Sequence, residues 1–183
     1  PEPGNSIANM DQLVHRLNRF LDPAIRIYEA REVQPNWHAR FDATARSYEY
    51  ILCASGSPFW RNNAWMVERL PDLAKMNEAA KLLLTETDFA SFCKVGSDNK
   101  TTICNVTRAE WVMEGEVVTF HITADRFLRN MVRAIVGSLY EVGNGKWSVA
   151  EFNARFAQKN RGTMGTSAPA QGLYLTEVTY NNL

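Results

Sequence analysis

Residues 125–143 read DRFLRNMVRAIVGSLYEVG, and this stretch decides the fold that the sequence predicts. At about 100° per residue, its apolar side chains fall on one side and its arginines near the opposite side. Asp125 suits an N-cap, and Gly143 with Gly145 supplies a stop. We therefore expect one amphipathic helix over 125–143 whose apolar side packs on a sheet. The apolar residues are Phe127, Leu128, Met131, Val132, Ile135, Val136, Leu139 and Val142.

The arginine side of this helix has two interpretations. Charged side chains on the outer face of an amphipathic helix are most often only solvated. A solvated face usually mixes Glu and Lys for i,i+4 pairs, whereas Arg126, Arg129 and Arg133 bring arginine alone. Because a guanidinium forms bidentate bonds with carboxylates and phosphates, this composition suggests an anionic partner, and both interpretations stay open.

Further helices and strands are predicted around this stretch. Because a hairpin joined at Glu114-Gly115 requires antiparallel pairing while helices also alternate with strands, the predicted class is α+β. We expect a mixed, largely antiparallel sheet with helices packed on one side. The predicted helices span 9–21, 71–84 and 148–158, and the predicted strands span 44–53, 101–113, 116–124 and 173–180.

The composition of the 183-residue chain bounds its class. A hydrophobic content of 45% is ordinary for a globular protein, and this length suits one well-buried domain. The formal net charge is zero, so a nucleic acid would have to meet a local basic patch. Three cysteines without a CxxC pair argue against a disulfide framework and favour a reducing, cytoplasmic location. No apolar run predicts a membrane span or a signal peptide.

Few short motifs with a known mechanism occur in the sequence. His15, His38 and His121 are scattered, so we expect no metal site. The sequence shows neither a P-loop lysine nor a nucleophile elbow. Residues 161–171 are rich in Gly, Ser and Pro, and we expect an irregular loop there that borders a site.

One predicted strand combines an aromatic ring with a guanidinium. Arg46 and Tyr48 share a face of strand 44–53. Such a pair can stack on a base and hold a phosphate or a carboxylate. The alternative is a cross-strand tyrosine in a half-buried sheet, and residue types alone do not decide between the two.

Four blocks of the sequence resemble the tRNA pseudouridine synthase A (TruA) family, in the family's own order. The blocks are Trp37–Tyr50, Asp88–Phe92, Phe127–Gly137 and Gly172–Leu175. The resemblance implies a pseudouridine synthase-like fold and isomerisation of uridine to pseudouridine in the anticodon arm of tRNA. It further implies a homodimer that works without a cofactor or a metal.

The resemblance also implies that this chain is a C-terminal part. In the family, an aspartate nucleophile sits in a Gly-Arg-Thr-Asp-Ala-Gly-Val-His loop, and this sequence lacks that loop. Residues 1–36 are then the tail of an N-terminal domain with a connector, and residues 37–183 are the C-terminal catalytic-cleft domain. We expect the chain to be inactive alone.

Residue roles follow from the same resemblance. Tyr48 matches the family's active-site tyrosine, which stacks on the target base, and Arg133 matches the arginine that pairs with the aspartate. An adjacent guanidinium keeps a carboxylate ionised and oriented. The residues expected to bind substrate are Arg46, Leu173, Arg126, Arg129, His38 and Arg40.

Two rival functions stay open at this point. The chain could be a non-catalytic RNA-binding module of the same fold, although it lacks the RNP1 pattern of an ordinary RNA-recognition motif. It could also serve mainly for dimerisation. The sequence immediately upstream, which either contains the aspartate loop or does not, separates both rivals from the enzyme.

Overall fold

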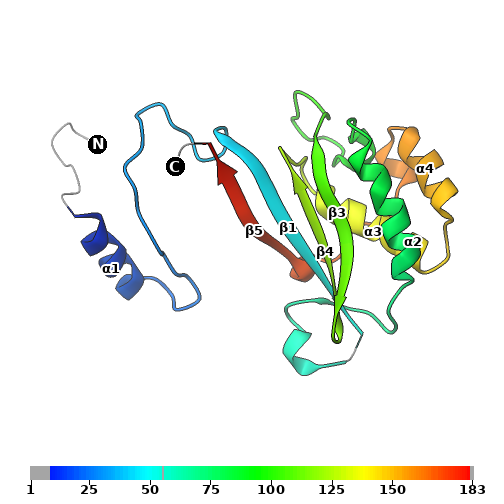
Figure 1. Ribbon diagram of the computed structural model, residues 1–183, viewed down its shortest axis with the longest axis horizontal. Helices are drawn as coiled ribbons and strands as arrows, with labels where there is room; N and C mark the ends of the chain where they lie inside the picture. The colour runs from blue at the N-terminus through cyan, green and yellow to red at the C-terminus, as the bar shows by residue number, and fades with distance from the viewer. Residues whose placement is uncertain (1–8, 55, 182–183) are drawn as a thin grey trace. The chain divides into compact units, whose positions relative to one another are not determined.

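A five-stranded sheet carries the larger of the two units into which the computed structural model divides the chain (Figure 1). The structure describes residues 9–54 and 56–181, and the units comprise residues 1–39 and 40–183.

Strand β1 (Ala43–Cys53) lies at the centre of the sheet. It pairs antiparallel with β4 (Val117–Ala124) on one side and with β5 (Leu173–Tyr180) on the other. The short β2 (Trp65–Met66) runs parallel to the end of β1. β3 (Val106–Glu114) pairs antiparallel with β4 and forms the other edge of the sheet. The predicted hairpin and the predicted mixed, largely antiparallel sheet are confirmed.

Helices cover one side of this sheet, as predicted. α2 (Leu73–Lys81), α3 (Met131–Gly143) and α4 (Val149–Ala157) lie together on that side in Figure 1. Ser148 caps α4 in a complete capping box with Glu151. The α+β class is therefore confirmed.

The core fills the space between the sheet and these helices. Alternate residues of β1 and β4 point into it, and the apolar side of the 125–143 stretch meets them. A group of aromatic rings closes the core beneath α4. The fully buried large side chains include Tyr50, Leu52, Phe120, Ile122, Ile135, Leu139, Phe89, Phe92 and Phe152.

The start of the central helix differs from the prediction. α3 begins at Met131, and Asn130 before it has a left-handed backbone with φ of 67°. Arg126 and Arg129 therefore lie in a turn ahead of the helix, so the prediction that they share one helix face with Arg133 is wrong. Asp125 is not the N-cap.

Contacts from distant segments explain this late start. In a helix from 125, the Asp125 carbonyl would accept from the N–H four residues on, but here it accepts from Arg46 Nη1 at 2.7 Å. The Asp125 carboxylate accepts from Asn105 N at 2.8 Å. The Arg129 carbonyl accepts from Lys94 N at 3.3 Å. Because these groups are already bonded, regular helix begins only after them.

The second strand of the predicted set also begins later than expected. β3 starts at Val106 and not at 101, because the residues before it bond to a turn instead. Ile103 forms an isolated bridge with Asp88, and Cys104 N donates to Thr87 O at 2.9 Å. This turn buries Phe89.

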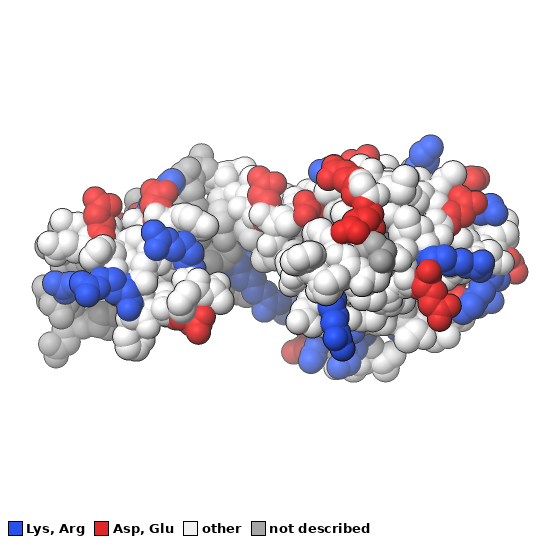
Figure 2. All heavy atoms as spheres, turned by 90° about the horizontal axis from the view of Figure 1, so that it is seen from below, with Lys and Arg blue, Asp and Glu red and all other residues white. Residues whose placement is uncertain are grey.

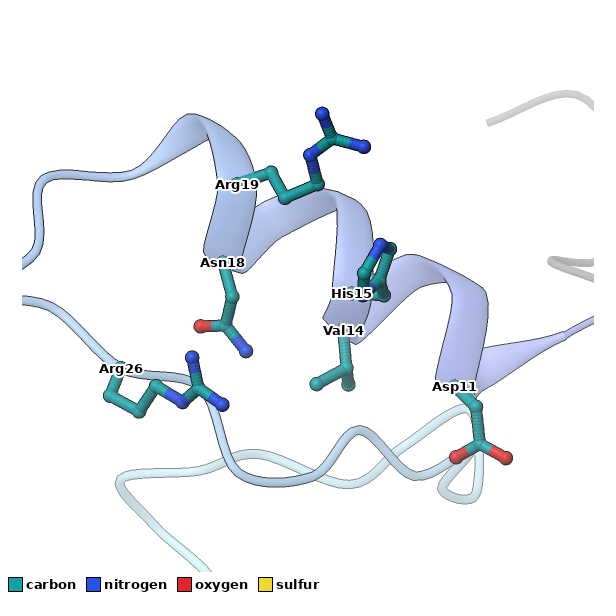
Figure 3. A pocket seen from close by; sticks show the side chains of 6 residues that line it. All are labelled: Asp11, Val14, His15, Asn18, Arg19 and Arg26. Atoms are coloured by element: carbon teal, nitrogen blue, oxygen red, sulfur yellow. The ribbon is translucent and has the colours of Figure 1, made fainter.

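The smaller unit, residues 1–39, contains α1 (Met10–Phe20), close to the predicted 9–21. Asn18 bonds to both backbone groups of Ile27, at 2.7 and 2.8 Å. Figure 3 shows a shallow hollow here, with Asn18 and Val14 pointing from α1 toward the side of Arg26. The assignment of 1–36 to a neighbouring domain stays a prediction, and residues 1–8 lie outside the described residues.

None of the helices in residues 9–54 and 56–181 combines the length and the apolar character needed to cross a membrane.

Asn77 of α2 joins that helix to the edge of the sheet. Its Nδ2 donates to Trp111 O at 2.9 Å, and its Oδ1 accepts from Trp111 N at 2.7 Å. Because β3 is an edge strand, these two backbone groups have no neighbouring strand to bond. The Asn77 amide takes the place of that strand.

We predict that Asn77→Ala lowers the free energy of unfolding by about 1–3 kcal/mol, because it leaves half-buried backbone groups without partners. The control is Glu78→Ala on the exposed side of the same helix, which should change it by less than about 0.5 kcal/mol. Urea unfolding followed by tryptophan fluorescence measures both. Equal effects of the two substitutions would contradict the proposed edge contact.

Candidate functional site

The candidate site begins with the tyrosines of β1 that face the helices. Tyr48 is half-buried, and its ring meets the Phe127 ring edge-on, with 5.0 Å between the centroids. Phe127 lies in the turn just ahead of α3. Among the described residues, the Tyr48 hydroxyl makes no hydrogen bond. The ring is thus held in place while its hydroxyl stays available.

Segment 164–169 joins β1 to the start of α3. Arg133 donates from Nε to Ala168 O at 2.6 Å, and Ala168 N donates back to Arg133 O at 2.9 Å. The Tyr50 hydroxyl donates to Pro169 O at 2.7 Å. Consecutive carbonyls of one segment therefore fix Tyr50 and Arg133 beside each other.

The acid–base state of Tyr50 fits this positioning role. Burial raises the pKa of its hydroxyl well above the ordinary value, and the charge of Arg133 only partly opposes the rise in pKa. Tyr50 therefore stays protonated and keeps donating to Pro169 across the physiological pH range. It was not among the predicted site residues.

Gly137 lets segment 164–169 lie directly on α3. A Cβ at this position would come within 1.8 Å of the Thr166 carbonyl oxygen. Next to it, the buried Ser138 donates its hydroxyl to Ala134 O at 2.8 Å and accepts from Gly165 N at 3.0 Å. A backbone-to-backbone contact therefore holds the segment, and this contact needs glycine.

Arg133 has no carboxylate partner in the part of the chain that the structure describes. It is half-buried, and Ala168 O is the one acceptor that its guanidinium bonds among the described residues. A half-buried cation normally pairs with an anion, and the rest of the guanidinium fork fits a carboxylate or a phosphate. The site is therefore open to an anion from outside these residues.

Arg46 is placed differently from the prediction that it binds substrate. Its guanidinium donates to the carbonyls of Ala43 and Asp125, at 2.7 Å each, and to the carbonyl of Arg40. These bonds tie the start of β1 to the turn ahead of α3. Arg46 is thus a structural clamp, and its predicted contact with substrate would have to compete with these carbonyls.

The other predicted substrate-binding residues are spread around this centre. Arg129 is exposed, and Arg126 is half-buried, where its charge opposes the burial that raises the pKa of Cys104 to about 11. Leu173 is half-buried and pairs with Tyr50 in the sheet. Arg40 lies over the Phe41 ring at 5.7 Å.

His38 belongs to the other unit, residues 1–39, and its contact with substrate stays a prediction. Arg40 is the first residue of the unit that carries the site.

Sequence reasoning missed three polar residues beside the site. Asn130 and Arg161 both donate to the Ser167 hydroxyl oxygen, at 2.6 and 3.0 Å. A signal for Asn130 did exist, because asparagine adopts a left-handed backbone more readily than most residues. The loop 161–171 was expected to border a site without any of its residues being singled out.

The charges around the site are local and do not belong to a large field of one sign. On the face of unit 40–183 seen in Figure 2, acidic and basic side chains intermingle. This agrees with the formal net charge of zero. An anionic partner would therefore meet particular arginines and not a broad basic surface.

The fold and the site define an α+β protein that places a tyrosine ring and a guanidinium, which has no carboxylate partner among the described residues, on one side of a mixed sheet. Residues 79–181 match the family model described as tRNA pseudouridine synthase. The chain belongs to the tRNA pseudouridine synthase family.

Several relatives are named tRNA pseudouridine synthase A. Those from Bacteroides fragilis and Parabacteroides distasonis are 48% and 45% identical to the chain, over 94% and 95% of its length and 69% of each relative. The one from Bacteroides thetaiotaomicron is 51% identical over 90% of the chain and 62% of the relative. The chain thus spans about two thirds of the length of these relatives.

We predict that Gly137→Ala lowers the free energy of unfolding by about 3 kcal/mol, the upper end of overpacking effects, because the new methyl group displaces segment 164–169. Gly162→Ala is the matched control, since its Cβ would meet only the end of the Asn160 side chain, at 3.3 Å. Urea unfolding measures both variants. A Gly137→Ala protein as stable as Gly162→Ala would contradict the close contact.

Proposed function

We propose that this chain is the C-terminal part of an enzyme that isomerises uridine to pseudouridine in the anticodon arm of tRNA. The observation that carries the proposal is the half-buried Arg133, which lacks a carboxylate among the described residues. Such a cation suits an aspartate nucleophile that comes from outside this chain. The names of the relatives support the reaction.

Arg133 and Tyr48 have different roles in the proposed reaction. The reaction breaks the bond from C1′ to N1 of uridine, rebuilds it from C1′ to C5, releases the C5 proton and adds a proton to N1. Arg133 keeps the incoming aspartate ionised and aimed, because a guanidinium beside a carboxylate favours its charged form. Tyr48 stacks on the target base, and its unbonded hydroxyl can take part in moving the proton.

The remaining predicted residues bind or position substrate in this proposal. Arg126 and Arg129 contact phosphates of the tRNA from the turn ahead of α3. Leu173 supports the pocket beneath the base, and Arg40 and His38 also bind the RNA. Arg46 holds the turn in place through its carbonyl bonds.

We also propose a cytoplasmic homodimer, as in the family that the sequence resembles. The cysteines support a reducing compartment, because neither Cys93 nor Cys104 forms a disulfide within residues 9–54 and 56–181.

We expect no tritium release from a tRNA transcript labelled at uridine C5 when this chain acts alone, and release when the missing N-terminal half is added and shown to associate. Release by the chain alone would mean that a nucleophile lies within it. If the associated halves released no tritium, the result would favour the non-catalytic RNA-binding module.

Two arginines should separate chemistry from binding in the full-length protein. Arg133→Ala should abolish tritium release while tRNA binding stays nearly unchanged, and the Ala168 N bond to the Arg133 carbonyl should keep the loop in place. Arg129→Ala should weaken binding and flatten its dependence on salt, because an exposed arginine acts through phosphate. Filter binding at several salt concentrations measures this. Equal loss of binding in both variants would refute the division.

A further inference from the structure

Ser167 is the centre of a small group of hydrogen-bond donors that the proposed reaction does not use. Its hydroxyl oxygen accepts from Asn130 Nδ2 at 2.6 Å and from Arg161 Nη2 at 3.0 Å. A hydroxyl has one proton to donate and lone pairs to accept, and here both lone pairs are occupied. The Ser167 O–H is therefore left as a donor toward an acceptor from outside. We call Asn130, Arg161 and Ser167 the Ser167 group.

Arg161 brings a positive charge to the Ser167 group without an anion to balance it. Its guanidinium is half-buried and forms no ion pair with any residue in 9–54 or 56–181. Burial lowers its pKa, yet a guanidinium stays protonated in proteins. One N–H is engaged by the neutral Ser167 oxygen, and the rest of the fork remains for an acceptor.

The start of α3 adds further donors beside this group. Asn130 turns its side chain to Ser167 and does not cap the helix. The backbone N–H groups of Val132 and Arg133 bond to no described residue. The first turn of a helix carries partial positive charge and favours anions.

The Ser167 group is placed directly beside the proposed catalytic arginine. Ser167 precedes Ala168 in the chain. The Ala168 N–H donates to the Arg133 carbonyl, and the Ala168 carbonyl accepts from the Arg133 side chain. A ligand held at Ser167 would therefore lie next to the reacting nucleotide, and not at a remote surface.

We propose that Arg161, Ser167 and Asn130 form a phosphate-binding site that holds one backbone phosphate of the RNA next to the target uridine. This inference rests on the proposed function for the identity of the RNA. A phosphate suits the group because it accepts several hydrogen bonds at once and fits the arginine fork. A carboxylate from the protein would occupy Arg133 instead, so the two anions would be held side by side.

The test compares three substitutions in the full-length protein by binding of an unmodified tRNA transcript at increasing salt. Arg161→Gln should reduce the slope of log Kd against log salt concentration by about 0.7–0.9, the share of one phosphate contact in a single strand or a duplex. Arg161→Lys should keep the slope, because the charge remains. The matched control is Arg155→Gln, which removes an arginine that already packs on Trp147 at 4.5 Å and donates to Thr163 O.

The outcomes separate this site from the proposed enzyme. If Arg161→Gln keeps the wild-type slope of log Kd against log salt concentration while the unsubstituted full-length protein releases tritium, the phosphate site is refuted and the proposed function stands. If the unsubstituted full-length protein releases no tritium but Arg161→Gln still lowers the slope, the phosphate site stands and the enzymatic proposal fails. An unfolding midpoint of Arg161→Gln equal to that of Arg161→Lys would show that both variants are folded.

A second measurement identifies the source of the phosphate. The Arg161 Nε–H signal in a ¹⁵N NMR spectrum should shift when the tRNA transcript is added, and Ser167→Ala should reduce the shift. A shift with inorganic phosphate but none with tRNA would overturn the assignment to RNA.

Discussion

The close contact between Gly137 and Thr166 is the constraint on which the rest of the site depends. Because α3 presents a bare backbone at Gly137, segment 164–169 can lie against the helix with its carbonyls in fixed places. Ala168 O then meets Arg133 and Pro169 O meets Tyr50. The same segment continues through Gly172, whose missing Cβ leaves room for the Tyr50 ring and for the Ile51 carbonyl of β1. Backbone packing therefore sets the position of each polar group.

The arginines of the site show that residue type alone does not decide whether a guanidinium stabilises the fold or binds an anion. Arg46 bonds the carbonyls of three residues and so stabilises a turn. Arg133 and Arg161 each bond one neutral oxygen among the described residues, and their charge is not matched by a carboxylate there. Removing a cation from water without a counter-ion costs free energy, which an incoming anion can offset. The difference between a clamp and a binding group is thus visible only in the number of internal acceptors.

The sequence predicted most of the fold because apolar periodicity reports which face of an element is buried. The α+β class, the hairpin of β3 and β4 and the helix over 148–158 followed from local patterns. The start of α3 could not be predicted in this way. It depends on Arg46 and Lys94, which lie 79 and 35 residues from the carbonyls of Asp125 and Arg129 that they bond. Ser167 was missed for the same reason, since Asn130 lies 37 residues away.

The separation of donors from a nucleophile also explains how binding and chemistry can be independent in this family member. The described part of the chain supplies a ring at Tyr48, a guanidinium at Arg133 and the donors around Ser167, all fixed by contacts within unit 40–183. None of these positions needs an aspartate to be held. In the proposed function, a carboxylate from the other part of the protein would therefore meet a preorganised cation, and little entropy would be lost in ordering the arginine. In the proposed function, the reaction needs the other part of the protein, whereas the proposed contacts with phosphate do not.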